Sequence, residues 1–103
     1  MEAPTTDITV ERNTHVDPVE AAYARQQIHS LARWMGLAIE AAHVELTRTP
    51  LVSASNGEHT AFASCSLRAG GHSVTSLAEG RTMFEAIDLL TVRLRRMIEA
   101  AAQ

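Results

Sequence analysis

The stretch that decides the fold is Ala78-Glu79-Gly80-Arg81-Thr82-Met83-Phe84-Glu85-Ala86-Ile87-Asp88, together with the apolar residues that follow it. The apolar residues of this segment recur at intervals of three and four, which is the period of a helix that buries one side. They are Met83, Ile87, Leu90, Leu94, Met97, Ile98 and Ala101. Thr82, or the preceding Gly80-Arg81, stands where such a helix would begin. The sequence therefore predicts a long amphipathic helix over residues 82–101.

A second helix is predicted over residues 19–35. Asp17 suits the N-cap position and Pro18 the first helical position, while Gly36 suits the end of the helix. One side of this helix carries the apolar residues Tyr23, Ala24, Ile28, Leu31, Trp34 and Met35. We expect this side to face a core and the opposite side, with Arg25, His29 and Arg33, to face solvent.

Four short segments have the pattern of strands. Residues 8–10 are a short first strand, and residues 42–49, 61–68 and 72–78 alternate between apolar and polar side chains. The expected inward residues are Val44, Leu46, Ala63, Cys65, Leu67 and Val74, whereas Leu77 is out of step and indicates a possible bulge. Gly70-Gly71 predicts a tight hairpin, and residues 50–60, with Asn56-Gly57, predict a longer polar loop.

These elements follow the order β-α-β-β-β-α. Because each helix has one apolar stripe, we expect an α+β fold in which both helices pack on one face of a four-stranded sheet. The 103 residues suffice for one domain, here residues 8–101 after a flexible N-terminus of residues 1–7.

Several functional classes are disfavoured. No segment has the roughly 18 uninterrupted apolar residues of a membrane span, and the N-terminus lacks the pattern of a secretion signal. Cys65 is the single cysteine, which excludes an intramolecular disulfide and is consistent with a cytoplasmic location. We expect no membrane and no DNA partner.

No catalytic, metal or cofactor site is expected. The five histidines, His15, His29, His43, His59 and His72, share no spacing typical of metal ligands. Cys65 is predicted to be a buried apolar residue rather than a nucleophile. Glu85 and Asp88 lie on the polar side of a helix, with nothing that places them in a cleft. The chain is therefore not expected to be an enzyme.

The net charge of −3 disfavours nucleic-acid binding, which usually requires a basic protein. All nine basic residues are arginines, however, and arginine can both grip a phosphate and stack on a base. Whether the chain can bind nucleic acid therefore depends on how these arginines are distributed over the surface.

The quoted segment, with the Arg93-Leu94 and Arg96 that follow it, resembles the ribosome hibernation-promoting and sigma-modulation family. Members of this family carry an Ala-Glu-Gly turn, then Asp-Met-Tyr-Ala-Ala-Ile-Asp, a Lys-Leu and an Arg. Here Thr82, Phe84, Glu85 and Arg93 replace the Asp, Tyr, first Ala and Lys. Residues 13–35 also align with the first helix of the family without a gap, and the resemblance covers about residues 8–98.

The resemblance implies a fold similar to double-stranded-RNA-binding domains and a site on the small ribosomal subunit near the decoding centre. A protein bound there would inhibit translation during dormancy or stress. The sequence departs from the family where lysines are replaced by Gln27 and Ser30, and where a basic tail is replaced by Ala100-Ala101-Ala102-Gln103. The larger relatives add a C-terminal dimerisation domain, so the 103 residues are expected to be either a short form or the N-terminal domain of a longer protein.

The candidate residues for ribosomal RNA are Arg25, His29, Arg33, Arg48, Arg68, Arg93 and Arg96, and the outer arginines of the two helices are expected to form one basic groove. The alternative is that they are solvated surface charges, as an i, i+4 pair of Arg95 with Glu99 would be. A second functional hypothesis is a protein-interaction domain, homodimeric or regulatory, that has lost RNA binding. Its evidence is the acidic net charge and an outward apolar pair, Leu89 and Val92.

Overall fold

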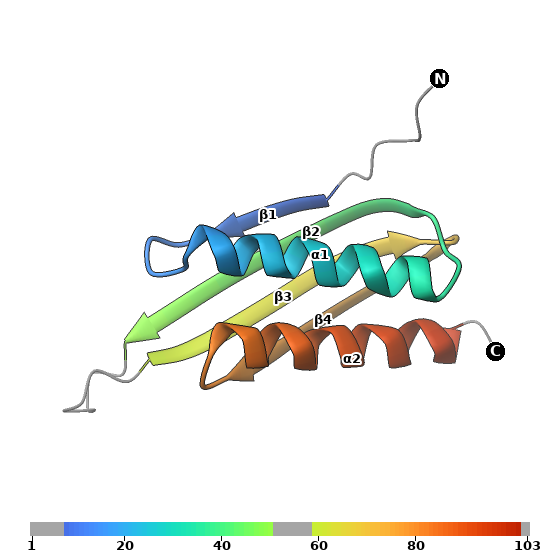
Figure 1. The fold of residues 1–103 in the computed structure, drawn as a ribbon. Helices are drawn as coiled ribbons and strands as arrows, with labels where there is room; N and C mark the ends of the chain where they lie inside the picture. Colours follow the sequence, from blue (N-terminus) through green and yellow to red (C-terminus); the bar gives the residue numbers. More distant parts are fainter. Residues whose placement is uncertain (1–7, 51–58, 102–103) are drawn as a thin grey trace, which may run out of the picture.

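The computed structural model of the chain describes residues 8–50 and 59–101. Its elements run in the order β-α-β-β-β-α (Figure 1). They are β1 (Ile8–Arg12), α1 (Pro18–Trp34), β2 (Ile39–Pro50), β3 (His59–Ala69), β4 (His72–Gly80) and α2 (Met83–Ala101). The strands form one sheet in the order β1-β2-β3-β4, in which β1 is parallel to β2 and the other pairs are antiparallel. Both helices cover the same face of this sheet, so the predicted α+β fold is confirmed (Figure 1).

The predicted limits of α1 are confirmed within one residue. The backbone N–H of Asp17 donates a hydrogen bond of 3.0 Å to Oε1 of Glu20, which satisfies a donor that the first helical turn leaves free. Gly36 has a φ of +71°, a conformation that glycine adopts without steric cost, and the helix ends just before it. The crossover through α1 is what allows β1 and β2 to pair in parallel.

The β3–β4 hairpin is the tight turn that the sequence predicts. Gly70 and Gly71 both have positive φ, +57° and +82°, as a two-residue turn between twisted strands requires. The pairing continues without interruption from Ala69↔His72 to Ala61↔Gly80, so no bulge occurs at Leu77. Leu77 instead points to the open face of the sheet and is 58% exposed. The register shift of the sheet lies in β2, between Ile39 and Ala41.

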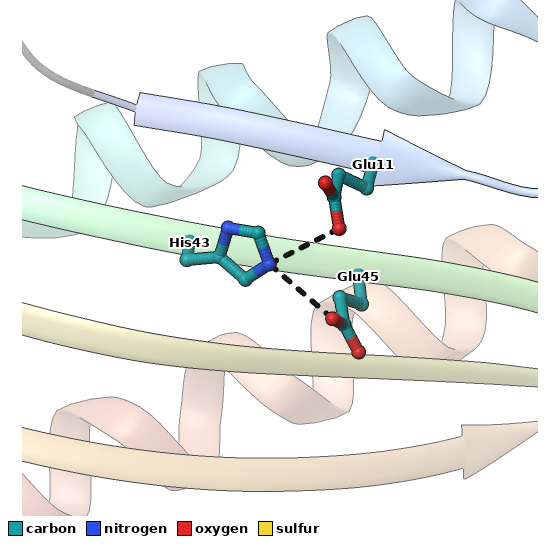
Figure 2. A group of neighbouring side chains, drawn as sticks. All are labelled: Glu11, His43 and Glu45. Carbon is teal, nitrogen blue, oxygen red and sulfur yellow. Dashed lines mark hydrogen bonds and ion pairs between the residues drawn. The ribbon is translucent and has the colours of Figure 1, made fainter.

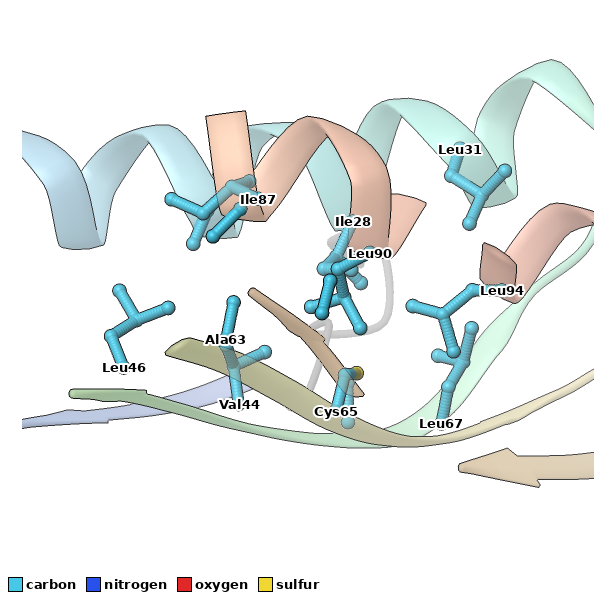
Figure 3. Close-up of a cluster of buried hydrophobic side chains, with 14 of the residues drawn as sticks. Ile28, Leu31, Val44, Leu46, Ala63, Cys65, Leu67, Ile87, Leu90 and Leu94 are labelled. Carbon is cyan, nitrogen blue, oxygen red and sulfur yellow. The ribbon is translucent and has the colours of Figure 1, made fainter. Parts of the chain in front are cut away.

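The core lies between the sheet and the two helices (Figure 3). Every residue that the alternation predicted to point inward is buried: Val44, Leu46, Ala63, Cys65, Leu67 and Val74. The helices close the core with Ala24, Ile28, Leu31, Met83, Ile87, Leu90, Leu94 and Ile98. Trp34 was expected on the core side of α1, but it is 70% exposed. It lies at the edge of the apolar side of α1 and lines the groove between the two helices instead of the core.

Some predictions fall outside the described residues. These are the flexible N-terminus over residues 1–7, the Asn56-Gly57 part of the polar loop, and the last two residues, Ala102 and Gln103. Within the described part, neither helix is long and apolar enough to cross a membrane.

Candidate nucleic-acid interface

A groove of 590 Å³ runs between the two helices on the outer side of the helix layer. Its lining combines aromatic, amide, hydroxyl and charged side chains: Tyr23, Gln27, Ser30, Leu31, Trp34, Asp88, Thr91, Val92 and Arg95. The α1 residues among them recur every three or four positions, so one side of α1 faces the groove along most of its length. The groove is thus built by the packing of α1 beside α2, not by a loop.

One part of the groove is closed by contacts between the helices. Tyr23 Oη donates a hydrogen bond of 2.5 Å to Oδ1 of Asp88, and Gln27 Nε2 donates one of 2.9 Å to Tyr23 Oη. The hydrogen bond to Asp88 raises the pKa of Tyr23 above its ordinary value. The Tyr23 ring also meets Phe84 edge to face at 5.0 Å between centroids. These contacts hold the two helices at a defined spacing.

Further along the groove, Arg95 lies over the indole of Trp34, with 5.3 Å between the guanidinium carbon and the ring centroid. Arg95 Nε is buried and has no hydrogen-bond partner within the described part of the chain. Trp34 remains 70% exposed. The pair therefore presents a large aromatic surface beside a guanidinium group.

The helices separate their charges along their length. They run in the same direction, so their C-terminal halves lie at the same end of the molecule (Figure 1). The C-terminal halves carry Arg33, Arg93, Arg95 and Arg96 against the single carboxylate of Glu99, while the other carboxylates of the helices, Glu20, Glu85 and Asp88, lie nearer the N-terminal ends. A negative net charge for the chain thus coexists with a locally basic end around Trp34.

The structure does not bring Arg25 and Arg93 into one groove. Arg25 donates a hydrogen bond to the carbonyl oxygen of Ile8, and Arg25 and His29 line a hollow beside β1. Arg93 donates one of 2.5 Å to the carbonyl oxygen of Leu77 on the opposite edge strand, β4. Because the two helices turn these residues toward opposite edges of the sheet, they flank the helix layer instead of meeting. Arg33 and Arg96 are exposed, and RNA contact for all five residues stays a prediction.

The two candidate arginines of the sheet, Arg48 and Arg68, lie elsewhere. Arg48 forms an ion pair with the carboxylate of Glu20, which is 6% exposed, and it also donates to the carbonyl oxygen of His15 at 3.1 Å. Its guanidinium therefore compensates a buried carboxylate. Arg68 lies on the open face of the sheet, away from both helices. A single RNA surface on the helix layer does not include these two residues.

The apolar pair Leu89 and Val92 is less exposed than the helical period indicated. Both are half-buried, Leu89 packs against the core, and Val92 lines the interhelical groove. The apolar residues that the helix layer does expose are Val19, Trp34, Phe84 and Met97. An interaction role for Leu89 and Val92 stays a prediction.

Sequence reasoning missed the pairing of Trp34 with Arg95. Arg95 was interpreted as a partner of Glu99 one helical turn away, but among the described residues its aromatic contact is with Trp34 on the other helix. The available signal was a tryptophan at the border of the apolar arc of α1 and a run of three cations within four residues of α2.

Cys65 is buried in the core, as predicted, and burial raises the pKa of its thiol to about 12. A thiol that stays protonated at neutral pH is a poor nucleophile. The structure thus places Cys65 among the packing residues.

Two solved structures share this fold along nearly the whole chain. A ribosomal subunit interface protein from Coxiella burnetii has a TM-score of 0.67 at 17% sequence identity, with 94% of this chain and 99% of that chain covered. The N-terminal domain of Protein Y from Thermus thermophilus has a TM-score of 0.59 at 14% identity, with 91% of this chain and 97% of that chain covered. No family model and no curated protein matches the sequence. At these identities the likeness establishes the fold, which is the one that the sequence resemblance implied.

Proposed function

We propose that this chain is a ribosome-binding protein of the hibernation-factor type, which binds ribosomal RNA with the basic end of its helix layer. It would occupy the decoding region of the small subunit and inhibit translation in dormancy or stress. The observation that carries the proposal is the exposed Trp34 with the Arg95 guanidinium over its ring, near helix ends that also carry the exposed Arg33 and Arg96.

The chemistry of this surface fits RNA. An exposed aromatic ring beside a cation offers a stacking platform for an unpaired base, and arginine contacts to phosphate supply the rest of the affinity. The second face of the Trp34 ring is available for a base, since the side chain is largely exposed. The half-buried guanidinium of Arg95 adds positive charge beside this ring.

The solved structures support the same reading. The Coxiella burnetii protein is described as a ribosomal subunit interface protein, and the alignment covers almost all of both chains. The shared fold therefore includes the helix layer on which the proposed surface lies.

Co-sedimentation with purified small ribosomal subunits tests the proposal. The chain is expected to travel with the subunit at low salt, and binding should fall steeply as salt is raised, because RNA contacts release counterions. A chain that stays at the top of the gradient at low salt would overturn the proposal.

Substitution of Trp34 tests the surface itself. Trp34→Ala is expected to weaken binding about fivefold or more, since stacking on one base contributes about 1–3 kcal/mol. Leu77→Ala is the matched control, because Leu77 is also an exposed large apolar residue but lies on the open face of the sheet. Equal affinities of the two variants would remove Trp34 from the binding surface.

The inhibitory role needs its own measurement. In a reconstituted translation reaction, the chain should lower protein synthesis in proportion to the fraction of small subunits that it occupies. Binding without inhibition would confine the proposal to ribosome association.

The alternative proposal is a protein-interaction domain of the same fold. It is favoured by the apolar exposure of the helix layer at Val19 and Phe84 in addition to Trp34. Light scattering after size-exclusion chromatography would show a dimer, and Val92→Asp should dissociate it. Val92 is the better test position, because Leu89 packs against the core and its substitution would also disturb folding. A monomer at all concentrations would exclude the homodimer.

A further inference from the structure

The open face of the sheet carries a cluster of three side chains that the proposed function does not use. Glu11 comes from β1, and His43 and Glu45 come from β2 (Figure 2). His43 Nε2 lies 3.3 Å from Oε1 of Glu11 and 3.3 Å from Oε2 of Glu45. One nitrogen and two oxygens, all within 4.8 Å of one another, therefore converge on one point above the sheet.

The backbone register brings these groups together. Glu11 is the direct cross-strand partner of Glu45 in the parallel β1–β2 pair, and His43 precedes Glu45 by two residues, so all three point to the same face. Like charges directly opposite each other on neighbouring strands are destabilising. The Glu11–Glu45 pairing thus favours a positive charge between the two carboxylates.

We propose that Glu11, His43 and Glu45 form a binding site for a divalent transition-metal ion, with Zn²⁺ as the expected occupant. In a tetrahedral zinc site the ligands lie about 2.0–2.1 Å from the ion, which separates neighbouring ligand atoms by about 3.3–3.4 Å. Both His43-to-carboxylate distances are 3.3 Å. Two of the three separations between these ligand atoms therefore already match an edge of a zinc tetrahedron, and the third, between the two carboxylate oxygens, is within 4.8 Å.

The donor set selects the metal. An imidazole with two carboxylates suits Zn²⁺ and the other later first-row ions, whereas Mg²⁺ prefers an octahedron of oxygen ligands. Three protein ligands leave the fourth position of a tetrahedron to water. The position is accessible to solvent, since the three side chains are 45% to 62% exposed.

The ion would join the edge strand β1 to β2. β1 has only five residues and one neighbouring strand, so its sheet pairing depends on β2 alone. A metal bridge between Glu11 and Glu45 replaces a repulsion across this strand pair with a shared ligand. Zinc is therefore expected to stabilise the folded chain.

Calorimetric titration of the untagged chain with ZnCl₂ tests the site. One ion per chain is expected, with a rise in Tm of about 4 °C or more once zinc is well above its Kd. MgCl₂ under the same conditions should give neither signal. Co²⁺, used in place of Zn²⁺, should show the intense visible absorption of a tetrahedral complex.

Three variants decide whether these residues are the ligands. His43→Gln and Glu45→Gln are expected to weaken zinc binding at least tenfold, while His29→Gln, an exposed histidine of α1, should bind like the wild type. Glu11→Gln should change the Tm of the metal-free chain little, because it removes both the repulsion by Glu45 and the contact with His43, yet abolish the rise caused by zinc. No saturable uptake, or uptake that survives His43→Gln, would overturn the proposal.

The proposals of a metal site and of an RNA surface can be tested independently. The cluster lies on the open face of the sheet and Trp34 lies on the helix layer. His43→Gln should therefore leave ribosome co-sedimentation intact, and Trp34→Ala should leave zinc binding intact.

Discussion

The two solvent-facing sides of this molecule are built from the same chain but carry different chemistry. The outer side of the helix layer presents Trp34 and Arg95, in helix halves that also carry the exposed Arg33 and Arg96. The open face of the sheet presents hydroxyl side chains and the Glu11–His43–Glu45 cluster. A net charge of −3 averages over these sides and describes neither. A weakly acidic chain can therefore still have a surface suited to an anionic partner.

The geometry of helices and sheets explains the difference. Neighbouring strands lie about 4.8 Å apart, so side chains on the same face meet directly and can form a tight cluster. Two packed helices lie about 8–10 Å apart, and only the side chains that border their contact meet across it. Trp34 and Arg95 meet in this way, while Arg25 and Arg93 turn to opposite edges. A sheet therefore favours compact ligand sets, and a helix pair favours an extended surface.

The largest expected effect is on the free energy of unfolding, which should depend on whether the substituted residue lies in the core or on the open face of the sheet. Leu90→Ala should lower the free energy of unfolding by about 2–5 kcal/mol, because Leu90 is fully buried between α2 and the sheet. Leu77→Ala, on the open face, should change it by less than about 0.5 kcal/mol. Urea denaturation measures both values. Equal costs would mean that the open face is covered in solution.

Arg48 is expected to contribute to the stability of the fold and not to RNA binding. Arg48→Ala should destabilise the chain by about 1–3 kcal/mol, since it leaves the buried carboxylate of Glu20 without its cation. The variant that remains folded should still bind small subunits. Replacing the pair together, with Glu20→Gln and Arg48→Met, should recover much of the stability. Lost binding at unchanged stability would return Arg48 to the RNA surface.

Charge reversal of one arginine on each side tests whether only the helix layer binds RNA. Arg95→Glu should weaken binding to small subunits about tenfold or more, or about 1.4 kcal/mol, and reduce the dependence of binding on salt. Arg68→Glu changes the net charge equally but lies on the open face of the sheet, so binding should change little. Filter binding at two salt concentrations measures both. Equal losses would indicate a general effect of charge and not a defined surface.

The smallest effect is expected for the reactivity of Cys65, whose thiol lies in the core between the sheet and the helices. Burial raises the pKa of Cys65 from 9.0 to about 12, so the folded chain should react slowly with a thiol reagent at pH 8. A Ser66→Cys thiol in a Cys65→Ala background should react quickly, because Ser66 points to the open face. Fast reaction of Cys65 without denaturant would show that the inner face of the sheet is accessible to solvent.

The same thiol gives stability a pH dependence with a defined sign. An acid whose folded pKa is raised stays protonated in the fold, so its contribution is fully present below pH 9 and is lost as the pH rises from 9 toward 12. Wild-type stability should fall by up to about 1.4 kcal/mol per pH unit in that range relative to Cys65→Ala. Parallel curves for the two chains would exclude this cause.

Much of the fold was predictable because its signals are local. Asp17, Pro18 and Gly36 limit α1 through the conformations that these residue types prefer, and Gly70-Gly71 makes the hairpin turn for the same reason. The alternation around Cys65 assigned the inner and outer residues of β3 correctly. Wrong expectations concerned places where two elements meet, such as the exposure of Trp34 and of Leu89.

Local patterns predict the elements, their order and the residues that turn inward, since periods of two and 3.6 are properties of neighbouring residues along the chain. Only the tertiary structure decided which side chains meet across elements. It placed Arg95 on Trp34 and His43 between Glu11 and Glu45, and it separated Arg25 from Arg93. The physical reason is that such meetings depend on strand register and helix placement, which the whole core sets through packing rather than any one segment.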